Sequence, residues 1–501
     1  MLKNWKEDLR AGFIIFLIAL PLSIGIALAA GAPASAGIMA AIIGGIVGTV
    51  FTGFHVGISG PAAGLISVIL VSIQSLADNG DLMLGFKRTL AATVVVGVMQ
   101  IIVGLFKKGR LAFLAPSSVV HGMLSAIGVI IMIKQIPVLL GVKPAGKGMI
   151  GILTGLPTMI AHEDAPIAFI GFLSLLTLIL WNNFAKKFSK IIPGPLLAVS
   201  LGLFLGYYFD IEHPHEIMFF QSMHHLGPEF LVHVPDKLSE LIIFPDFSII
   251  TETRSIIAIF TIFFVASLES LLSTYAVDKL DPEKRVSDLD YDILAKGITN
   301  LACGLFGAYP IITEIVRSSA NIANGAKTKW SNFYHGVFIL SFVALFPDLL
   351  NHIPLASLAA VLFIVGFNLA HPRHFIAVYK HGADQLLIFV VTLLVTVFDD
   401  LLVGVATGVV LQIIILFFNK VSFGEFFKPD VRYEEMNDEN IIFIHSSVVF
   451  TGYLKVKDLL DKAMANDKKL SVVHKGKENH FMDLTIKELF HDYQSKKGSK
   501  H

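Results

Sequence analysis

Long apolar runs separated by short polar stretches repeat along roughly the first four fifths of the chain. A helix that spans a bilayer needs about 20 consecutive, mostly apolar residues. Runs such as IIFLIAL, AAIIGGIVGTVF and LLIFVVTLLVTVF meet this requirement together with their flanks, and we expect about fourteen segments of this kind. The pattern predicts an α-helical polytopic membrane protein, with segments centred near residues 20, 44, 68, 97, 125, 174, 200, 264, 301, 318, 341, 361, 391 and 409.

The third and the tenth of these segments are short and interrupted. The third begins with ISGPAAG, and from Pro61 to Leu76 it has about 16 residues. At 1.5 Å per residue this is roughly 24 Å, less than the hydrocarbon thickness of about 30 Å. The tenth lies in AYPIITEIVRSSANIANGAKTK, which contains proline, glutamate, arginine and two asparagines. Interrupted segments at matching positions in two seven-span halves indicate the binding site of a transporter.

The physics of a broken helix favours an anion at such a site. A half-helix that begins at membrane depth directs free N–H groups and the positive end of its dipole into the site. Gly57, Gly60 and Gly64 allow close approach of backbone or ligand, and we expect Ser59 to cap the third helix and Pro61 to fit its first turn. The alternative is that these small residues only pack helices closely. The matching second segment, with its arginine, favours the anion site.

Three charged residues inside predicted spans are candidates for function, because charge at membrane depth is costly. Arg317 is expected to contact an anion through its charge and N–H donors, the alternative being a structural pair with a carboxylate. Glu269 has Ser273 four residues later on the same helix face, so it could carry a proton or, with Ser273, hold a sodium ion. A salt bridge from Glu269 to Arg317 is equally open. Glu314 opposes anion binding unless it is protonated or paired.

The charges between the segments predict the orientation of the chain. With fourteen spans, basic residues gather in the loops on the side of the N-terminus, as the positive-inside rule requires of cytoplasmic loops. Both termini are therefore predicted to be cytoplasmic. The basic loop residues are Lys107, Lys108, Arg110, Lys186, Lys187, Lys190, Lys279, Lys284, Arg285, Lys327, Lys329, Arg373 and Lys380.

The composition changes after Phe418. We expect a transmembrane transport domain over residues 1–420 and a small α/β cytoplasmic domain over 421–501. In the second domain, IIFIH, VVFTG and LSVV are predicted to be strands, and YLKVKDLLDKAM and TIKELFHDY helices.

Composition and motifs also argue against several other classes of protein. The 39 basic and 39 acidic residues balance and lie mostly between the apolar segments, which gives no reason to expect nucleic acid as a partner. The one cysteine, Cys303, lies in an apolar run and excludes a disulfide framework or a cysteine-based metal site. MLKNWKEDLR leads into the first segment without a small-residue cleavage site, so no cleavable signal is expected. We find no ATP-binding or catalytic motif, and we expect a transporter driven by a gradient, not an enzyme.

Several stretches resemble the SulP family of inorganic anion transporters, the sulfate permease-like proteins that share the fold of the uracil permease type. The similarity covers almost the full length, and EIVRSSANIANGAKT is its most specific part. The C-terminal region resembles a short STAS domain, with HFMDLTIKELF where that family opens a helix after an Asp-Ser-Ser/Thr turn. The other stretches are DLRAGFIIFLIALPLSIGIALAAGAP, ISGPAAG, PSSVVHGMLSAIGVIIMIKQIP, IPGPLLAV, AKGITNLACGLFGAYP and DDLLVGVATGVVL.

The resemblance implies two inverted seven-span repeats, a core that moves against a gate domain in an elevator-like cycle, and a homodimer. It also implies an anion site between half-helices 3 and 10, close to helices 1 and 8. By motif position the anion contacts are Leu22, Ser23, Gly60, Pro61, Ala62, Val316, Arg317 and Ser318, and the proton- or sodium-coupling residues are Glu269, Ser273 and Glu314.

This chain departs from the family pattern at three places. Leu22 stands where many members have glutamine, which removes a polar contact to substrate. Glu314, Ile315 and Val316 precede Arg317 where many members have small or hydroxyl residues. The STAS-like region ends after its second helix and is expected to be reduced or truncated.

We therefore expect a secondary transporter of a small inorganic anion in a bacterial inner membrane, coupled to a proton or sodium gradient or to anion exchange. Sulfate and bicarbonate are the leading substrates, because sulfate is the commonest family label and the Glu269–Ser273 pair resembles the sodium site of bicarbonate-carrying members. Chloride exchange, a nucleobase or dicarboxylate permease on the same fold, and a sensor that binds an anion without transporting it are the alternatives.

Overall fold

The computed structural model divides into two compact units. The first comprises residues 1–109 and 127–369, and the second residues 110–126 and 370–501. The predicted domain boundary at residue 420 lies inside the second unit. The structure describes residues 4–61, 63–107, 116–144, 146, 148–184, 192–219, 222–399, 401–435, 439–464, 469–474 and 481–498.

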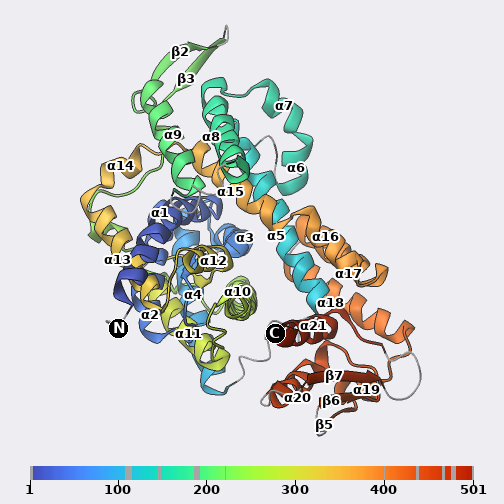
Figure 1. Ribbon diagram of the computed structural model, residues 1–501. Coiled ribbons are helices and arrows are strands. Elements are labelled where there is room, and N and C mark those ends of the chain that lie inside the picture. Colours follow the sequence, from blue (N-terminus) through green and yellow to red (C-terminus); the bar gives the residue numbers. More distant parts are fainter. Residues whose placement is uncertain are drawn as a thin grey trace. The chain divides into compact units, whose positions relative to one another are not determined.

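Helices dominate the described residues, and the centre of each of the fourteen predicted segments falls within one of them (Figure 1). Among the described residues, seven helical segments are long and apolar enough to cross a membrane, and five more are apolar but shorter. The prediction of a polytopic helical membrane protein is confirmed. The fourteen helices are α1 (Trp5–Ala29), α2 (Ala34–Phe51), α3 (Ile66–Leu76), α4 (Leu82–Leu105), α5 (Ser117–Leu139), α8 (Ala165–Phe184), α9 (Gly194–Tyr208), α10 (Thr253–Leu280), α11 (Leu289–Leu305), α12 (Ile315–Ala323), α13 (Trp330–Leu345), α15 (Leu355–Leu369), α17 (Ala383–Phe398) and α18 (Leu401–Phe418).

Small residues allow close helix packing in the first unit. A Cβ atom added to Gly97 of α4 would lie 2.5 Å from the backbone nitrogen of Leu301, and one added to Gly297 of α11 would lie 2.6 Å from that of Ile101. Such contacts require glycine, as in many membrane helix pairs. This packing fixes the position of α11, which also carries the buried polar residues Asp292, Lys296 and Asn300.

The two broken segments form the short helices that the sequence predicts. The 11-residue α3 follows a 3₁₀ turn, η1 (Ala63–Leu65), and α12 has nine residues. Both pack against α1 and α10, and Figure 1 shows α10 beside α3 and α12 in the first unit. Neither half-helix is long enough to cross a bilayer alone.

The rest of the first unit consists of short elements between the long helices. The β2–β3 hairpin follows α9, and its strands pair from His215 with Leu226 to Phe219 with Ser222. The bounds are α6 (Gly148–Thr154), α7 (Leu156–Ala161), β2 (His215–Phe219), β3 (Ser222–Leu226), η3 (Pro228–Phe230), η4 (Leu238–Leu241) and α14 (Pro347–Asn351).

The second unit combines helices with a small α/β fold. Its three-stranded sheet has the order β5-β6-β7, with β5 antiparallel and β7 parallel to β6. Helix α20 connects the two parallel strands, as a crossover must. The bounds are α16 (Pro372–Tyr379), α19 (Phe423–Phe427), β5 (Val431–Glu435), β6 (Glu439–Ile444), η5 (Phe450–Gly452), α20 (Tyr453–Met464), β7 (Lys469–His474) and α21 (Leu484–Gly498).

Two details of the predicted α/β region are wrong. VVFTG is not a strand: Val448 makes a single bridge to Met482, and the chain then turns through η5 into α20. The Phe450 amide donates to the buried Asp483 carboxylate at 2.7 Å, which directs this backbone away from the sheet. The sheet uses instead β5, which the sequence analysis missed.

Candidate functional site

Two three-residue strands join the beginnings of the half-helices. β1 (Ser59–Pro61) pairs antiparallel with β4 (Ile311–Thr313), and Gly60 lies opposite Ile312. Since the strands run in opposite directions, the chain enters α3 and α12 from opposite ends of this pair. The predicted capping of the third helix is wrong, because Ser59 and Pro61 belong to β1 and the α3 N-cap residue is Leu65.

Side chains complete the hydrogen bonding of the strand pair. Unpaired backbone groups are unfavourable at membrane depth, and a two-stranded ladder leaves its outer edges open. Asn300 of α11 accepts from the Ile311 amide at 2.7 Å and donates to its carbonyl at 3.2 Å. Asn332 of α13 accepts from the Ser59 amide at 3.1 Å, and Ser270 of α10 accepts from the Thr313 amide at 3.2 Å. These bonds make irregular backbone tolerable inside the helical bundle.

The pleat of β1 separates two polar groups. Neighbouring residues in a strand point to opposite faces. At Gly60, an added Cβ would lie 2.7 Å from Glu314 Oε1 and 2.9 Å from Arg317 Nη1. At Ser59, the hydroxyl accepts a hydrogen bond from Lys296 Nζ at 2.6 Å. The same strand therefore contacts an arginine–glutamate pair on one side and a buried lysine on the other.

Arg317 is the central cation of the first group. Its side chain is fully buried, and Nε forms an ion pair with Glu314 Oε2 at 2.9 Å. Nη1 donates to Ser23 Oγ of α1 at 3.1 Å. Nη2 is buried without a hydrogen-bond partner among the described residues. Of the two acids that the sequence analysis left open, Glu314 forms the ion pair with Arg317.

Glu269 lies beside the entrance to the first half-helix, α3. A Cβ at Gly64 would collide with its carboxylate, so the glycine is needed for the close approach of η1 to α10. Glu269 Oε2 is buried and unpartnered within the described structure. Its electrostatic neighbours include Glu314, which repels it. Ser273 is buried one turn later on α10, as the predicted pair requires.

The other residues predicted to contact the anion lie in different surroundings. Ser318 is engaged structurally, because its hydroxyl accepts from the Ile58 amide at 2.8 Å. The Val316 side chain is 59% exposed, whereas Arg317 next to it is fully buried. Leu22 is buried beside Ser23 on α1. Ala62 lies outside the described residues.

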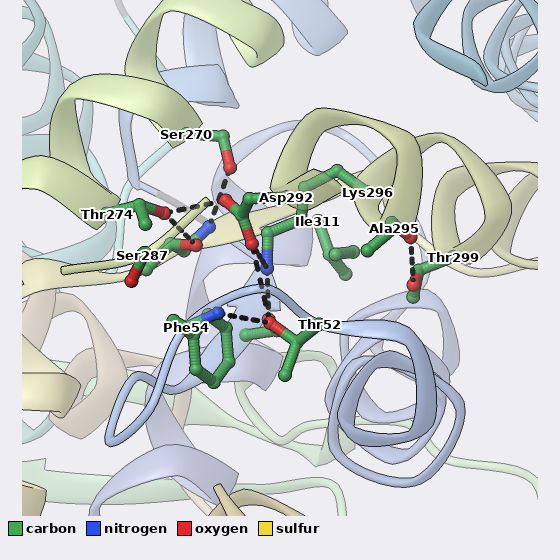
Figure 2. Close-up of polar contacts among 12 residues, drawn as sticks. Thr52, Phe54, Ser270, Thr274, Ser287, Asp292, Ala295, Lys296, Thr299 and Ile311 are labelled. Carbon is green, nitrogen blue, oxygen red and sulfur yellow. Dashed lines mark hydrogen bonds and ion pairs between the residues drawn. The ribbon is translucent and has the colours of Figure 1, made fainter. Parts of the chain in front are cut away.

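A buried network on α11 was missed by the sequence analysis (Figure 2). Asp292 Oδ2 lies 2.8 Å from the Thr274 hydroxyl of α10, and Asp292 Oδ1 lies 3.4 Å from the Thr52 hydroxyl, just after α2. Lys296 Nζ lies 3.9 Å from the same Oδ1 and 4.6 Å from the centre of the Phe54 ring. The i, i+4 spacing of an acid and a base in an apolar run was the available signal.

Two further buried groups face the arginine–glutamate pair. The hydroxyl of Tyr309, which precedes β4, has no hydrogen-bond partner in the described part of the chain. Its electrostatic neighbours are Glu269 and Glu314. His335 Nε2 on α13 is likewise unpartnered, and the ring interacts electrostatically with Arg317. Buried polar atoms without partners are rare in folded proteins, so a cluster of them identifies a candidate binding site.

This arrangement can hold a small anion. It offers unsatisfied guanidinium and hydroxyl donors, close backbone at Gly60, and the N-terminal end of α12, where the first N–H groups lack intrahelical acceptors. It also contains two acids that can hold a proton or a cation. Buried ionisable groups where interrupted helices meet are typical of the substrate sites of membrane transporters.

Comparisons with known proteins identify the family. The model of the sulfate permease family matches residues 5–392. The chain belongs to the sulfate permease family.

Relatives and solved structures agree with this assignment. A putative sulfate transporter, YvdB, from Bacillus subtilis is 28% identical over 82% of this chain and 74% of its own. The bicarbonate transporter BicA from Picosynechococcus sp. is 27% identical over 81% of this chain and 69% of its own. The transmembrane domain of a cyanobacterial BicA matches the fold with a TM-score of 0.66 at 23% identity, over 82% of this chain and 98% of that one. The overall structure of SLC26A9 matches the fold with a TM-score of 0.70 at 16% identity, over 98% of this chain and 83% of that one.

Proposed function

We propose that this chain is a secondary transporter that carries a small inorganic anion, sulfate or bicarbonate, across the membrane. The observation that carries the proposal is Arg317, a fully buried guanidinium with an unsatisfied Nη2 beside Gly60, where two half-helices meet. The relatives named as sulfate and bicarbonate transporters support an oxyanion substrate. Arg317 supplies directed N–H donors and charge, and the half-helix ends add their dipoles.

The site residues also favour an elevator-like cycle. Arg317, Glu314, Ser23, Gly60 and Glu269 all belong to the first compact unit. Hydrogen bonds from α10, α11 and α13 fix the strand pair that contains Gly60. The site can therefore move as one body, which alternating access by an elevator requires.

The orientation and assembly follow from the sequence. The basic loops support cytoplasmic termini in a bacterial inner membrane. The family resemblance supports a homodimer, which mass photometry of the purified protein would test. No nucleic acid or cofactor is needed; the coupling ion is a proton or sodium.

Uptake by proteoliposomes tests the function. Purified protein should accumulate labelled sulfate or bicarbonate, more strongly with an imposed inward proton or sodium gradient. Chloride uptake, or competition by uracil or succinate, would identify the alternative substrates. Anion binding without flux would indicate a sensor and contradict the proposal.

We assign the coupling of ion and anion to Glu269. Its oxygen Oε2 is unpartnered among the described residues beside the Gly64 turn, and Ser273, one turn later, adds a hydroxyl oxygen of the kind that hard cations take as ligands. Only these two groups are available as ligands for a sodium ion, so the coupling ion is equally a proton carried by Glu269.

Glu269→Gln should therefore keep anion uptake down an anion gradient and lose its dependence on proton or sodium gradients. The amide keeps the size of the side chain but can neither ionise nor release a proton. The measurement is initial uptake with and without each gradient. Glu163→Gln, in an exposed loop, is the matched control and should behave like the wild type. Full gradient dependence in Glu269→Gln would exclude the coupling role.

A further inference from the structure

The place where an anion would bind Arg317 already contains a carboxylate of the chain. Glu314, the N-cap residue of α12, reaches forward to Arg317 and places Oε2 2.9 Å from Nε. Its other oxygen, Oε1, lies 2.7 Å from the position of a Cβ on Gly60. The carboxylate and the guanidinium, whose Nη1 lies 2.9 Å from the same Cβ position, therefore both lie against Gly60.

The contact leaves both partners incompletely satisfied. An arginine has five N–H donors, and a carboxylate has about four acceptor positions. Glu314 Oε1 and Arg317 Nη2 are both buried and have no hydrogen-bond partner in the described structure. A structural salt bridge that repays its desolvation normally satisfies these atoms. The pair instead resembles a site that is partly filled.

We propose that Glu314 is a tethered anion that occupies Arg317 in the absence of substrate and is displaced by the transported anion. This inference rests on the proposed function and adds the regulation of the same site. A free anion with two or more oxygens can use Nη2 as well as Nε, and so contact more of the guanidinium than Glu314 does.

When the substrate displaces Glu314 from Arg317, the charges around Glu314 cause it to take up a proton. Once Arg317 is bound to substrate, the Glu314 carboxylate faces the substrate's negative charge and the repelling Glu269. A buried carboxylate near like charge binds a proton. The protonated acid can then donate a hydrogen bond to the anion that replaced it. Anion binding therefore takes up a proton at Glu314 while Glu269 is charged, and this linkage is lost in Glu269→Gln, which removes the repelling charge.

The other charged groups on the neighbouring elements are already engaged or lie elsewhere. On α1, Asp8 accepts from the Lys327 and Thr328 amides beyond the other end of α12. On α11, Asp292 and Lys296 contact one another, and Lys296 also contacts Ser59. The groups that face the pair are Glu269 on α10, Tyr309 before β4 and His335 on α13.

The test is the affinity of the purified full chain for anions as a function of pH. Sulfate and chloride are the probes, because their own charges do not change between about pH 5.5 and about pH 8.5, and isothermal titration calorimetry gives Kd. In the wild type, Kd should rise as the pH rises, with a limit of tenfold per pH unit for one linked proton. In Glu314→Gln, which cannot compete as an anion, affinity at about pH 8.5 should exceed the wild-type value by about tenfold or more. Glu163→Gln should keep the wild-type profile.

Three outcomes overturn the inference. One is a wild-type Kd that does not change with pH, which needs no variant. Another is equal or weaker affinity of Glu314→Gln at about pH 8.5. The third is a failure of wild type to bind either probe, which also counts against transport of these anions. If wild-type proteoliposomes transport sulfate or chloride while either of the first two results holds, the tethered-anion role alone fails. Glu314→Asp is the second variant: it keeps a carboxylate on a shorter arm and should retain pH dependence.

Discussion

Arg317→Ala is expected to lower anion uptake by about 30-fold or more. Removing one partner of a buried, hydrogen-bonded charge pair costs about 2–5 kcal/mol of binding, and each 1.4 kcal/mol is a factor of ten. Among the described residues, Arg317 is the cation at Gly60, and Lys296 contacts Ser59 on the other side of β1, so it does not replace that charge. Initial uptake of labelled sulfate and bicarbonate by proteoliposomes, at equal protein content, measures the effect.

Two companion variants separate charge from geometry and from folding. Arg317→Lys keeps a positive charge but not the planar set of N–H donors, so uptake should recover only in part. Arg10→Ala removes an exposed arginine near the start of α1 and should leave uptake unchanged. Wild-type uptake by folded Arg317→Ala would remove this residue from the mechanism.

Lys296→Met is expected to lower the free energy of unfolding by about 3–5 kcal/mol. Breaking a buried ion pair on one side costs this much because the other charge, here Asp292, stays buried. Methionine matches the length of lysine but cannot donate to Ser59, so β1 also loses its hydrogen bond from α11. Uptake should fall with stability, because Ser59 precedes the Gly60 contact with Arg317. Thermal unfolding in detergent and proteoliposome uptake are the two measurements.

The double variant Asp292→Asn with Lys296→Met tests whether the two charges act as a pair. Replacing both members of a buried ion pair by neutral groups is often close to neutral for stability. The double variant should therefore be more stable than Lys296→Met alone, while uptake stays reduced because Ser59 has lost its donor. A double variant no more stable than Lys296→Met would show that Asp292 and Lys296 are not energetically coupled.

The sequence predicted the membrane architecture because the bilayer imposes a simple requirement. About 20 apolar residues per span can be counted directly, and the proline and glycines of ISGPAAG mark a helix that cannot continue. Arg317 and Glu269 were found because charge is rare in spans. The same reasoning identified Glu314 as a conflict that pairing or protonation has to resolve.

What the sequence did not predict depends on contacts between distant segments. The pairing of Ser59–Pro61 with Ile311–Thr313 joins residues about 250 positions apart and replaces the expected helix cap. Lys296 lies in AKGITNLACGLF, which has the pattern of an ordinary span, and its role became visible only when Ser59 was placed beside it. The i, i+4 and i, i+3 spacings of Asp292–Lys296 and Glu314–Arg317 were present in the sequence. They identify pairs, but not what the pairs contact.

The most direct test of the central claim is to locate the anion. Crystals of the wild type grown with bromide or selenate, the heavier analogues of chloride and sulfate, give an anomalous signal at the bound ion. The account predicts a peak within hydrogen-bond distance of the Arg317 guanidinium, between Gly60 and the start of α12, and no peak there in Arg317→Ala. Peaks only elsewhere in the protein, or an unchanged peak in Arg317→Ala, would contradict it.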